Sequence, residues 1–361
     1  MKIAFRCDAS VEIGSGHVVR CLVLAEALRS QGAEVCFICR DHPGNLVALI
    51  QGKGIDVLVL PRGRPVNGSH ATTPRSRYAR WLGASQHEDA EFAIDFLTGW
   101  KPDWIVVDHY GLDRIWEGLL RSTAARMLVL DDLADRPHDC DILVDAGRMQ
   151  NARATYAQYL PEHAVLLTGL NYCLLHPRYA KHRMALQRNF ESVRRVLLYF
   201  GASDPTEQTG RWLGAIRTIP HRQWDLDLVI GRSDPRSNEH RETARTMERV
   251  TIHENLPDLA ALICDADLGV GAAGGTSFER CCLGLPSISV ITADNQRPAA
   301  NFLAGRRAHF LLGGEQLAPE AISRVLQTLP TRRGLLCRMS RRAASLVDGG
   351  GVSRIADAMR R

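Results

Sequence analysis

Residues 8–20 read DASVEIGSGHVVR and decide how the start of the chain is interpreted. They follow an apolar run of strand length, MKIAFRCD, and precede a helix-period pattern that ends near Gly32. A glycine-rich turn therefore lies where a first strand passes into a first helix. Glycines let the backbone turn sharply, and the first N–H groups of a helix have no partner inside it. We expect an anion or a sugar to bind at this turn, next to Gly14, Ser15, Gly16 and His17.

His17 is the residue of this turn that can carry chemistry. The helix dipole and the free N–H groups favour an anion and disfavour a protonated imidazole. A neutral histidine can accept a proton from water, which makes His17 a candidate general base. The competing interpretation is a tight turn whose histidine merely caps the helix, and the local pattern alone leaves both interpretations open.

The turn matches neither of two familiar phosphate-binding loops. A dinucleotide-binding fingerprint needs a third glycine, but the register that begins at Gly14 and Gly16 continues to Val19. No P-loop with its lysine is present either. The sequence therefore argues against an NAD-type or an ATPase-type loop.

Strand-like and helix-like segments alternate along the chain. The expected strands of the first half are MKIAFRC, EVCFIC, DVLVL, WIVVDHY, RMLVLDD and DILVDA, and those of the second half are RRVLLYFG, DLDLVIG, RVTIHE, DADLGVGA, SISVI and HFLLG. Apolar runs between amphipathic helices imply parallel sheets covered on both faces. The predicted fold class is therefore α/β, with two tandem doubly wound Rossmann-like domains and a cleft between them.

The 361 residues are enough for two domains, each with its own core. We expect a first domain at residues 1–175 and a second domain at residues 190–345. Residues 174–191 read as a linker, and residues 62–80 read as a long surface loop. The last segment, 346–361, contains a short amphipathic helix that could cross back onto the first domain. Ligands of such sheets bind beyond the carboxyl ends of the strands, so the cleft is the expected site.

The composition is that of an ordinary soluble protein, with 45% hydrophobic and 24% charged residues. The net charge of +5 comes from 41 arginines and 4 lysines, which are scattered and not interleaved with aromatic residues. We therefore expect no nucleic-acid partner. A phosphate-bearing small molecule would still find the average field favourable.

The ten cysteines lie mostly inside apolar stretches, which is typical of reduced, buried thiols. Cys36 and Cys39 form a lone C-x-x-C within one expected strand, where they would face opposite sides of the sheet. No metal and no cofactor is expected. The sequence shows no signal peptide and no apolar run of the roughly 20 residues that a membrane helix needs. A cytoplasmic protein without a membrane span is expected, and its oligomeric state stays open.

A second glycine-rich turn, GVGAAGGTSFE, occupies residues 269–279. It again lies between a strand-like run and a helix, so its free amides could hold a diphosphate, and Glu279 could accept hydrogen bonds from a ribose diol. The competing interpretation is a capping box formed by Thr276 and Glu279, which needs no ligand. The turn FGASDP at residues 200–205 repeats the pattern more weakly.

Polar side chains also follow several expected strands, where substrate-contacting residues of parallel sheets tend to lie. Each one could instead be a turn residue, because Asp and Asn favour such turns for local reasons. The residues in question are Asp108, His109 and Tyr110, then Asp131 and Asp132, then Asp294, Asn295 and Gln296.

With both glycine turns considered together, the chain resembles the UDP-sugar hydrolases of pseudaminic acid biosynthesis. These are related to a spore-coat polysaccharide protein family and, more remotely, to the MurG-type GT-B glycosyltransferases. The resemblance spans almost the whole chain. It implies a GT-B-like fold, with a sugar-side and catalytic first domain at residues 1–175 and a UDP-binding second domain at residues 190–345. Its motifs are DASVEIGSGHVVRCLVLA, YARWLG from Tyr78, VVDHYGLD, DDLADRPHDCDILVD, FGASDP, GAAGGTSFERCCLGLPSI and ADNQ.

The resemblance implies hydrolysis of UDP-2,4-diacetamido-2,4,6-trideoxy-β-L-altrose to the free sugar and UDP, with His17 as the general base. Water attack opposite the diphosphate would invert the anomeric centre. UDP is a good leaving group, so a second carboxylic acid is not needed. The implied UDP-binding residues are Gly201, Ser203, Gly274, Gly275, Thr276, Ser277 and Glu279. The implied substrate contacts are Gly14, Ser15, Gly16, Tyr78, Asp108, His109, Asn295 and Gln296.

Two segments depart from the family pattern, namely DAGRMQ from Asp145 and TGLNYCLLHP from Thr168, and both bear on sugar specificity. The main rival function is a GT-B glycosyltransferase, in which an acceptor hydroxyl replaces water on the same fold. Two further rival functions are a UDP-sugar 2-epimerase and a non-enzymatic nucleotide-sugar binding module.

Overall fold

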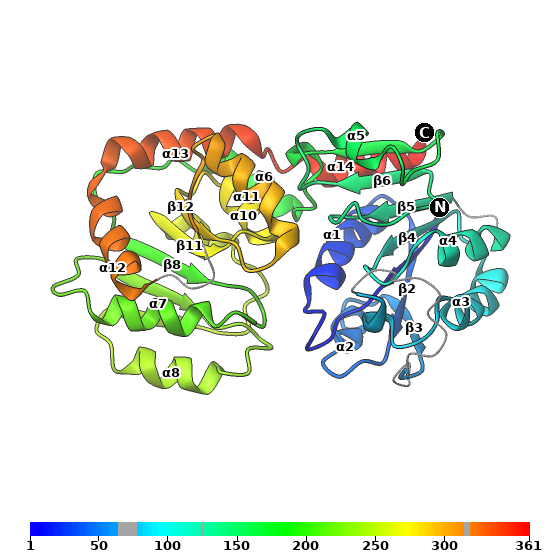
Figure 1. The fold of residues 1–361 in the computed structure, drawn as a ribbon, viewed down its shortest axis with the longest axis horizontal. Coiled ribbons are helices and arrows are strands. Elements are labelled where there is room, and N and C mark those ends of the chain that lie inside the picture. Colours follow the sequence, from blue (N-terminus) through cyan, green and yellow to red (C-terminus); the bar gives the residue numbers. More distant parts are fainter. Residues whose placement is uncertain (64–77, 124–125, 314–317) are drawn as a thin grey trace. The chain divides into compact units, whose positions relative to one another are not determined.

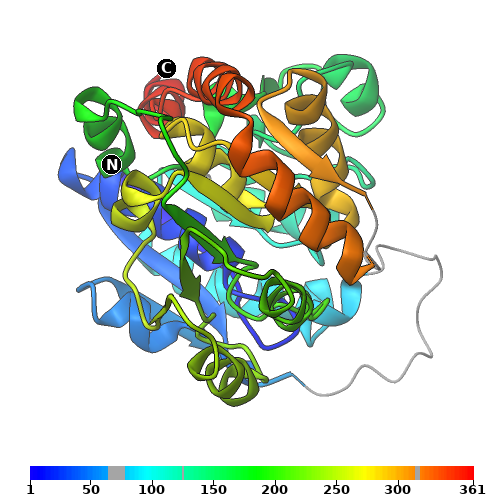
Figure 2. The same cartoon turned by 90° about the vertical axis from the view of Figure 1, so that its left-hand side faces the viewer.

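The computed structural model describes residues 1–63, 78–123, 126–313 and 318–361. The chain divides into two compact units, the first comprising Met1–Leu174 and Gly351–Arg361 and the second Leu175–Gly350. Each unit holds one parallel sheet with helices around it (Figures 1 and 2). Most of the expected surface loop at residues 62–80 lies outside the described residues. In the part of the chain that is described, no helix has the length and apolar character needed to span a membrane.

The first unit is built on a seven-stranded parallel sheet in the order β3-β2-β1-β4-β5-β6-β7. Its strands are β1 (Lys2–Cys7), β2 (Glu34–Arg40), β3 (Asp56–Leu60), β4 (Trp104–Asp108), β5 (Arg126–Leu130), β6 (Ile142–Asp145) and β7 (Val165–Thr168). Its helices are α1 (Gly16–Ser30), α2 (Val47–Gln51), α3 (Gln86–Trp100), α4 (Arg114–Leu120), α5 (Ala152–Tyr156) and α14 (Gly351–Arg360). This order places β1 beside β4, although β2 and β3 come between them in the chain.

Both faces of this sheet are buried, which explains why its strands are continuous apolar runs. One core contains Leu24 and Leu28 of α1 together with Phe5 and Phe37 of the sheet. The other contains residues of α3 and α4, including Trp116. The chain therefore fixes α1, and with it the first glycine turn, firmly against the sheet.

The C-terminal helix α14 belongs to the first unit (Figure 1). Its Ile355 and Met359 are fully buried, and the carbonyl of Met359 accepts hydrogen bonds from Trp104 Nε1 at 3.0 Å and from the Arg126 guanidinium at 2.8 Å. The first residue of the helix is a glycine because a Cβ on Gly351 would lie 2.2 Å from the carbonyl oxygen of Cys173. The end of the chain thus completes the core of the unit in which the chain begins.

The second unit has a six-stranded parallel sheet in the order β10-β9-β8-β11-β12-β13. Its strands are β8 (Arg195–Tyr199), β9 (Asp225–Val229), β10 (Val250–His253), β11 (Leu268–Ala272), β12 (Ser287–Val290) and β13 (His309–Leu312). Its helices are α6 (Pro177–Ala185), α7 (Gln208–Arg217), α8 (Ser237–Arg245), α9 (Ala260–Asp265), α10 (Gly275–Cys282), α11 (Arg297–Gly305), α12 (Pro319–Thr328) and α13 (Arg333–Leu346). Helix α12 packs against α7 over a core that includes Trp212 and Leu326 (Figure 2).

Two features were not expected from the sequence. The edge strand β7 was missed, because its four residues form a short run next to irregular chain. The expected linker at residues 174–191 contains α6, which begins where Pro177 supplies the first turn and His176 accepts a hydrogen bond from the N–H of Arg178. This helix contacts α9 and α10 and belongs to the second unit.

Candidate active site

The first glycine turn ends with open amides at the start of α1. The N–H of Gly14 donates to the carbonyl of Ser10 at 2.8 Å, and Gly14 has a φ of +79°, which favours glycine. Ser15 is the N-cap residue, but its side chain makes no capping hydrogen bond. Nothing lies within 4 Å of the position that a Cβ of Gly16 would take. The first N–H groups of α1 therefore stay available to a ligand.

His17 and Asp108 form a hydrogen-bonded pair at this turn. Nδ1 of His17 lies 2.6 Å from Oδ1 of Asp108, and the histidine is 7% exposed. Asp108 is the last residue of β4, which pairs with β1, so the sheet brings the carboxylate next to the turn after β1. Among the described residues no hydrogen-bond partner is seen for Nε2 of His17. The pair has the geometry of a histidine oriented by a carboxylate.

Arg20 holds this carboxylate in its charged form. Its Nε and Nη2 atoms donate to the two oxygens of Asp108 at 2.5 and 2.6 Å, and its Nη1 donates to Asp132 at 2.8 Å. Burial raises the pKa of Asp108, but the charges of Arg20 and His17 outweigh burial, and the pKa lies below its ordinary value. Asp108 therefore stays an anion and accepts a hydrogen bond from the Nδ1–H of His17.

Three aromatic rings form a wall beside His17. The centroid of Tyr110 lies 4.6 Å from the imidazole, and the Trp81 ring stacks on Tyr110 at 5.8 Å. The Tyr78 ring lies 4.5 Å from Trp81 and 5.1 Å from Tyr110. Trp81 Nε1 donates to Glu12, a residue of the glycine turn, at 3.1 Å. The wall is thus tied to the turn, and it provides the flat apolar surface on which sugar rings commonly pack.

The structure places Asp108 and His109, both expected substrate contacts, in buried positions. Asp108 has no exposed surface, and its oxygens are hydrogen-bonded to His17 and Arg20. His109 is 2% exposed, and its Nδ1 accepts a hydrogen bond from the N–H of Gly111 at 3.0 Å. Burial lowers the pKa of His109, against the opposing effect of Asp8. Its Nε2 lies 3.3 Å from an oxygen of Asp8.

Sequence reasoning missed Arg20 and Trp81 as members of this cluster. A signal for Arg20 was present, because residues three apart on a helix share a face and His17 and Arg20 have that spacing. Trp81 lies within the motif YARWLG, but it sits in a short 3-10 helix at Ala79–Leu82 that the sequence did not predict.

In the second unit, three turns follow neighbouring strands at the carboxyl edge of the sheet. β11 pairs with β8 and with β12, so the turns after these strands lie next to one another. They contain Gly201 and Ser203 after β8, Gly274 to Glu279 after β11, and Asn295 and Gln296 after β12. A Cβ on Gly274 would lie 3.3 Å from Nε2 of Gln296. The structure thus brings all nine second-unit site residues to one edge of this sheet.

The capping-box interpretation of this turn is wrong. The N-cap residue of α10 is Gly274, and neither Thr276 nor Glu279 caps the helix. Ser277 instead donates its hydroxyl to the carbonyl of Gly274 at 2.6 Å, and Thr276 accepts a hydrogen bond from Arg280 at 3.3 Å. No side chain caps the start of α10, so its first amides are open to an anion.

Glu279 points into a largely buried environment. Burial raises the pKa of its carboxyl to about 7, although nearby Tyr179 and Arg280 oppose the rise. Neither Oε2 of Glu279 nor the hydroxyl of Tyr179 makes a well-formed hydrogen bond among the described residues. The carboxyl therefore keeps acceptor capacity for a polar ligand.

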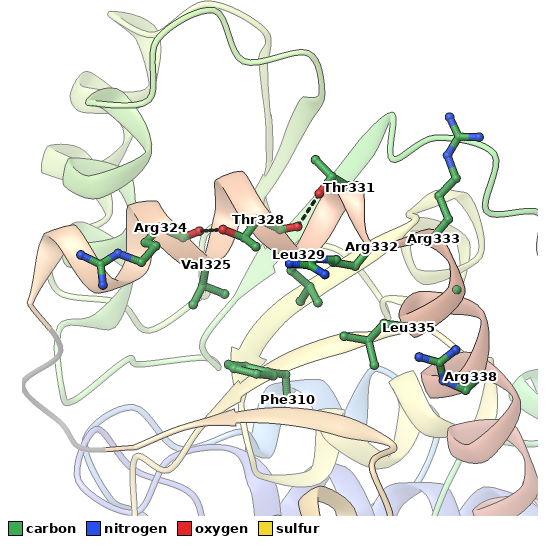
Figure 3. A pocket seen from close by; sticks show the side chains of 11 residues that line it. Phe310, Arg324, Val325, Thr328, Leu329, Thr331, Arg332, Arg333, Leu335 and Arg338 are labelled. Atoms are coloured by element: carbon green, nitrogen blue, oxygen red, sulfur yellow. Dashed lines mark hydrogen bonds between the residues drawn. The ribbon is translucent and has the colours of Figure 1, made fainter.

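A pocket of about 700 Å³ lies elsewhere in the second unit (Figure 3). Phe310 and Leu335 belong to its apolar lining, and Arg332 and Arg338 are among the four arginines around it. Phe310 is near the amino end of β13, whereas ligands of parallel sheets bind at the carboxyl ends. The pocket contains none of the expected site residues. Within the described ranges, no group of three or more His, Cys, Asp or Glu residues could hold a metal ion.

The chain is similar in sequence to known proteins over most of its length. No protein-family model matches it. The chain is 23% identical to the spore coat polysaccharide biosynthesis protein SpsG of Bacillus subtilis, covering 98% of this chain and 96% of SpsG. The chain is SpsG-like. It is also 23% identical to the UDP-2,4-diacetamido-2,4,6-trideoxy-beta-L-altropyranose hydrolase of Campylobacter jejuni, covering 84% of this chain and 96% of the hydrolase.

A solved structure assigns the fold of this SpsG-like chain. Acinetobacter baumannii MurG superimposes with a TM-score of 0.68 at 16% identity, covering 99% of both chains. The two parallel sheets and this superposition show the GT-B fold. The predicted α/β, GT-B-like fold class with two domains is confirmed.

Proposed function

We propose that this SpsG-like chain is a nucleotide-sugar hydrolase that cleaves UDP-2,4-diacetamido-2,4,6-trideoxy-β-L-altrose into UDP and the free sugar. The observation that carries the proposal is the His17–Asp108 pair at 2.6 Å beside the open amides of α1. The name of the Campylobacter relative supports the choice of substrate.

The proposed reaction uses His17 as the base. Asp108 accepts a hydrogen bond from the Nδ1–H of His17, which leaves the lone pair on Nε2 free to take a proton from a water molecule. The water oxygen forms a bond to the anomeric carbon from the side opposite the diphosphate. The bond between the anomeric carbon and the diphosphate oxygen breaks, and its electron pair leaves with UDP. The anomeric configuration is inverted, and His17 then releases its proton to solvent.

The second unit would hold the nucleotide at the start of α10. The open amides of Gly275 and Thr276 and the helix dipole stabilise the negative charge that grows on the leaving diphosphate. Glu279 lies one turn further along the helix and is the acceptor for the ribose hydroxyls. Gly201 and Ser203 would contact the nucleotide from the neighbouring turn, and Asn295 and Gln296 would contact the substrate from the turn after β12.

The aromatic wall would select the sugar. Tyr78 and Trp81 offer flat faces next to His17, where an apolar sugar face and the acetamido methyl groups can pack. Gly14, Ser15 and Gly16 would let the sugar approach the backbone closely. A 6-deoxy sugar suits this surface better than a sugar with a free primary hydroxyl.

A glycosyltransferase is the second candidate, because MurG shares the GT-B fold. The two functions differ in the nucleophile, which is water in one case and an acceptor hydroxyl in the other. Purified protein is incubated with a panel of UDP-amino sugars in the absence of any acceptor, and UDP release and the product anomer are followed by NMR. Stoichiometric release of UDP and free sugar supports the hydrolase, whereas release that requires an added acceptor supports the transferase.

A further inference from the structure

Arg280 is a buried arginine directly beneath the second glycine turn. It lies on α10 and is 2% exposed. Its Nη2 donates to the carbonyl of Ala272, the last residue of β11, at 2.9 Å, and to the hydroxyl of Ser289 at 3.3 Å. Its Nη1 donates to the hydroxyl of Thr276 at 3.3 Å. The guanidinium group is therefore fixed at the end of the strand from which the turn begins.

No carboxylate accepts a hydrogen bond from this guanidinium group within the described part of the chain. All three acceptors are neutral, and Nε has no hydrogen-bond partner there. His309, which contacts Ser289, is kept neutral because burial lowers its pKa. The neighbouring carboxyl of Glu279 makes no hydrogen bond to Arg280, and burial raises its pKa to about 7. Arg280 is thus a buried cation without a bound counter-charge.

Two glycines of β11 make room for this cation. A Cβ on Gly269 would lie 2.8 Å from Cδ of Arg280, and a Cβ on Gly271 would lie 2.8 Å from its Nη1. Real Cβ atoms do not approach other heavy atoms so closely. The alternating glycines of LGVGA therefore form a trough across the strand in which the arginine side chain lies.

A buried charge is costly unless an opposite charge or a favourable dipole compensates it. Burial lowers the pKa of Arg280 to about 10, which reflects this cost. The start of α10 does not compensate it, because the amino end of a helix is itself positive. The cation and the helix start therefore both favour an anion at this turn.

We propose that Arg280 is the buried counter-charge for the diphosphate of a uridine nucleotide bound at the turn Gly274–Ser277. This inference rests on the proposed nucleotide site and adds a positioning residue to it. Arg280 does not touch the ligand. It donates hydrogen bonds to Ala272 and Thr276 and so holds the turn in place. Its positive charge attracts the phosphate groups and not the uncharged nucleoside. Arg280 should therefore strengthen the binding of UDP but not that of uridine.

Arg188 provides a matched control in the same unit. It also donates only to neutral groups, namely the carbonyls of Ile263, Ala266 and Leu283 at 2.6, 2.6 and 2.7 Å. Burial lowers its pKa to about 10 as well. Two of these carbonyls lie at the carboxyl end of α9, where the helix dipole is negative and compensates the charge of Arg188. They lie near the amino end of β11, whereas the glycine turn follows the carboxyl end of that strand.

The test compares the binding of uridine, UMP and UDP by calorimetry for the wild-type chain and for Arg280→Met, Arg280→Gln and Arg188→Met. Arg280→Met should weaken UDP binding about tenfold to a hundredfold and change uridine binding less than about twofold, since only the phosphates interact with the lost charge. Arg188→Met should leave the ratio of UDP to uridine affinity unchanged. In ³¹P NMR, the pKa of the bound β-phosphate should be higher in Arg280→Gln than in the wild type.

Equal weakening of uridine and UDP by Arg280→Met would show a merely structural role and overturn the inference. If Arg280→Met does not fold, Arg280→Gln decides by the same affinity ratio and by the phosphate titration, and an unchanged ratio and titration overturn the inference. A wild-type chain that binds no uridine nucleotide contradicts both the nucleotide site and the role of Arg280. A wild-type chain that binds UDP but releases none from UDP-sugars contradicts the hydrolase alone.

Discussion

Nδ1 of His17 and Oδ1 of Asp108 are 2.6 Å apart, and Arg20 donates to both oxygens of the same carboxylate. The carboxylate thereby selects the tautomer of His17 that carries its proton on Nδ1. The basic lone pair then lies on Nε2, the ring nitrogen without a described protein partner. Replacing either residue should lower the rate of catalysis and leave nucleotide binding nearly unchanged.

Replacing His17 removes the base and leaves the nucleotide site intact. His17→Ala should lower kcat for UDP release by about a hundredfold to ten-thousandfold, the usual contribution of a positioned base. The Kd for UDP should stay the same in a calorimetric titration. His163→Ala, at an exposed histidine whose side chain is 58% accessible, is the control and should behave like the wild type. A parallel loss of UDP affinity and turnover in His17→Ala would contradict the assignment.

Replacing Asp108 removes the group that selects the tautomer. Asp108→Asn should lower kcat about a hundredfold or more with little change in KM, because the amide no longer fixes the Nδ1 proton. Asp132→Asn is the matched control, since Asp132 binds Arg20 and Tyr110 but not His17. Similar rates for the two variants in steady-state assays would argue against the orienting role.

The aromatic wall should govern sugar affinity. Trp81→Leu should raise KM for the UDP-sugar several-fold, and Trp81→Phe should largely restore it, because a stacked ring contributes about 0.5–1.5 kcal/mol. Trp100→Leu is the control, since Trp100 stacks on Phe96 in α3. The comparison is made by initial-rate kinetics. An unchanged KM in Trp81→Leu would exclude the ring from the sugar site.

Glu279 should make the stability of the second unit depend on pH. Burial raises its pKa from 4.5 to about 7. A carboxyl whose pKa is raised on folding is protonated in the folded state while the unfolded chain is ionised, so the free energy of unfolding falls as pH rises from about 4.5 to about 7. The loss is at most about 3.5 kcal/mol, because one pKa unit corresponds to about 1.4 kcal/mol.

Urea unfolding of the wild type and of Glu279→Gln at several pH values measures this effect. The difference in unfolding free energy between the two proteins should change between pH 4.5 and 7 and become constant above that range. A difference that is independent of pH would place the carboxyl in contact with solvent.

The packing of helix α14 in the first unit depends on Gly351. Gly351→Ala should lower the free energy of unfolding by about 1–3 kcal/mol, the usual cost of an overpacked site, since its Cβ would lie 2.2 Å from the carbonyl oxygen of Cys173. Gly99→Ala in α3 is the control, because nothing lies within 4 Å of its Cβ position. The control should stabilise the helix slightly. Denaturant midpoints that move in the same direction in both variants would contradict the close approach.

The α/β fold was predictable because its strands are continuous apolar runs, and all six expected strands of the second half are present. The strand β7 and the helix α6 were not predictable. A four-residue edge strand and a helix rich in charged residues have only weak apolar patterns. The two glycine turns between a strand and a helix were predicted from the sequence alone.

The link between His17 and Asp108 could not be read from the sequence. It depends on β4 pairing with β1, a neighbour relationship created by the reversal of strand order after β3. Asp108 was therefore expected to contact substrate, as polar residues at strand ends often do. The same limitation concealed Arg280, because its neutral partners come from β11, α10 and β12.

The proposed mechanism depends above all on water attacking the anomeric carbon of a UDP-sugar with His17 as the base. This step is tested by the reaction of UDP-2,4-diacetamido-2,4,6-trideoxy-β-L-altrose in H₂¹⁸O without an acceptor, followed by ¹H and ³¹P NMR. We expect that UDP appears without ¹⁸O and that the first sugar anomer formed is inverted. ¹⁸O in the β-phosphate of UDP, or no release until an acceptor alcohol is added, would contradict the mechanism.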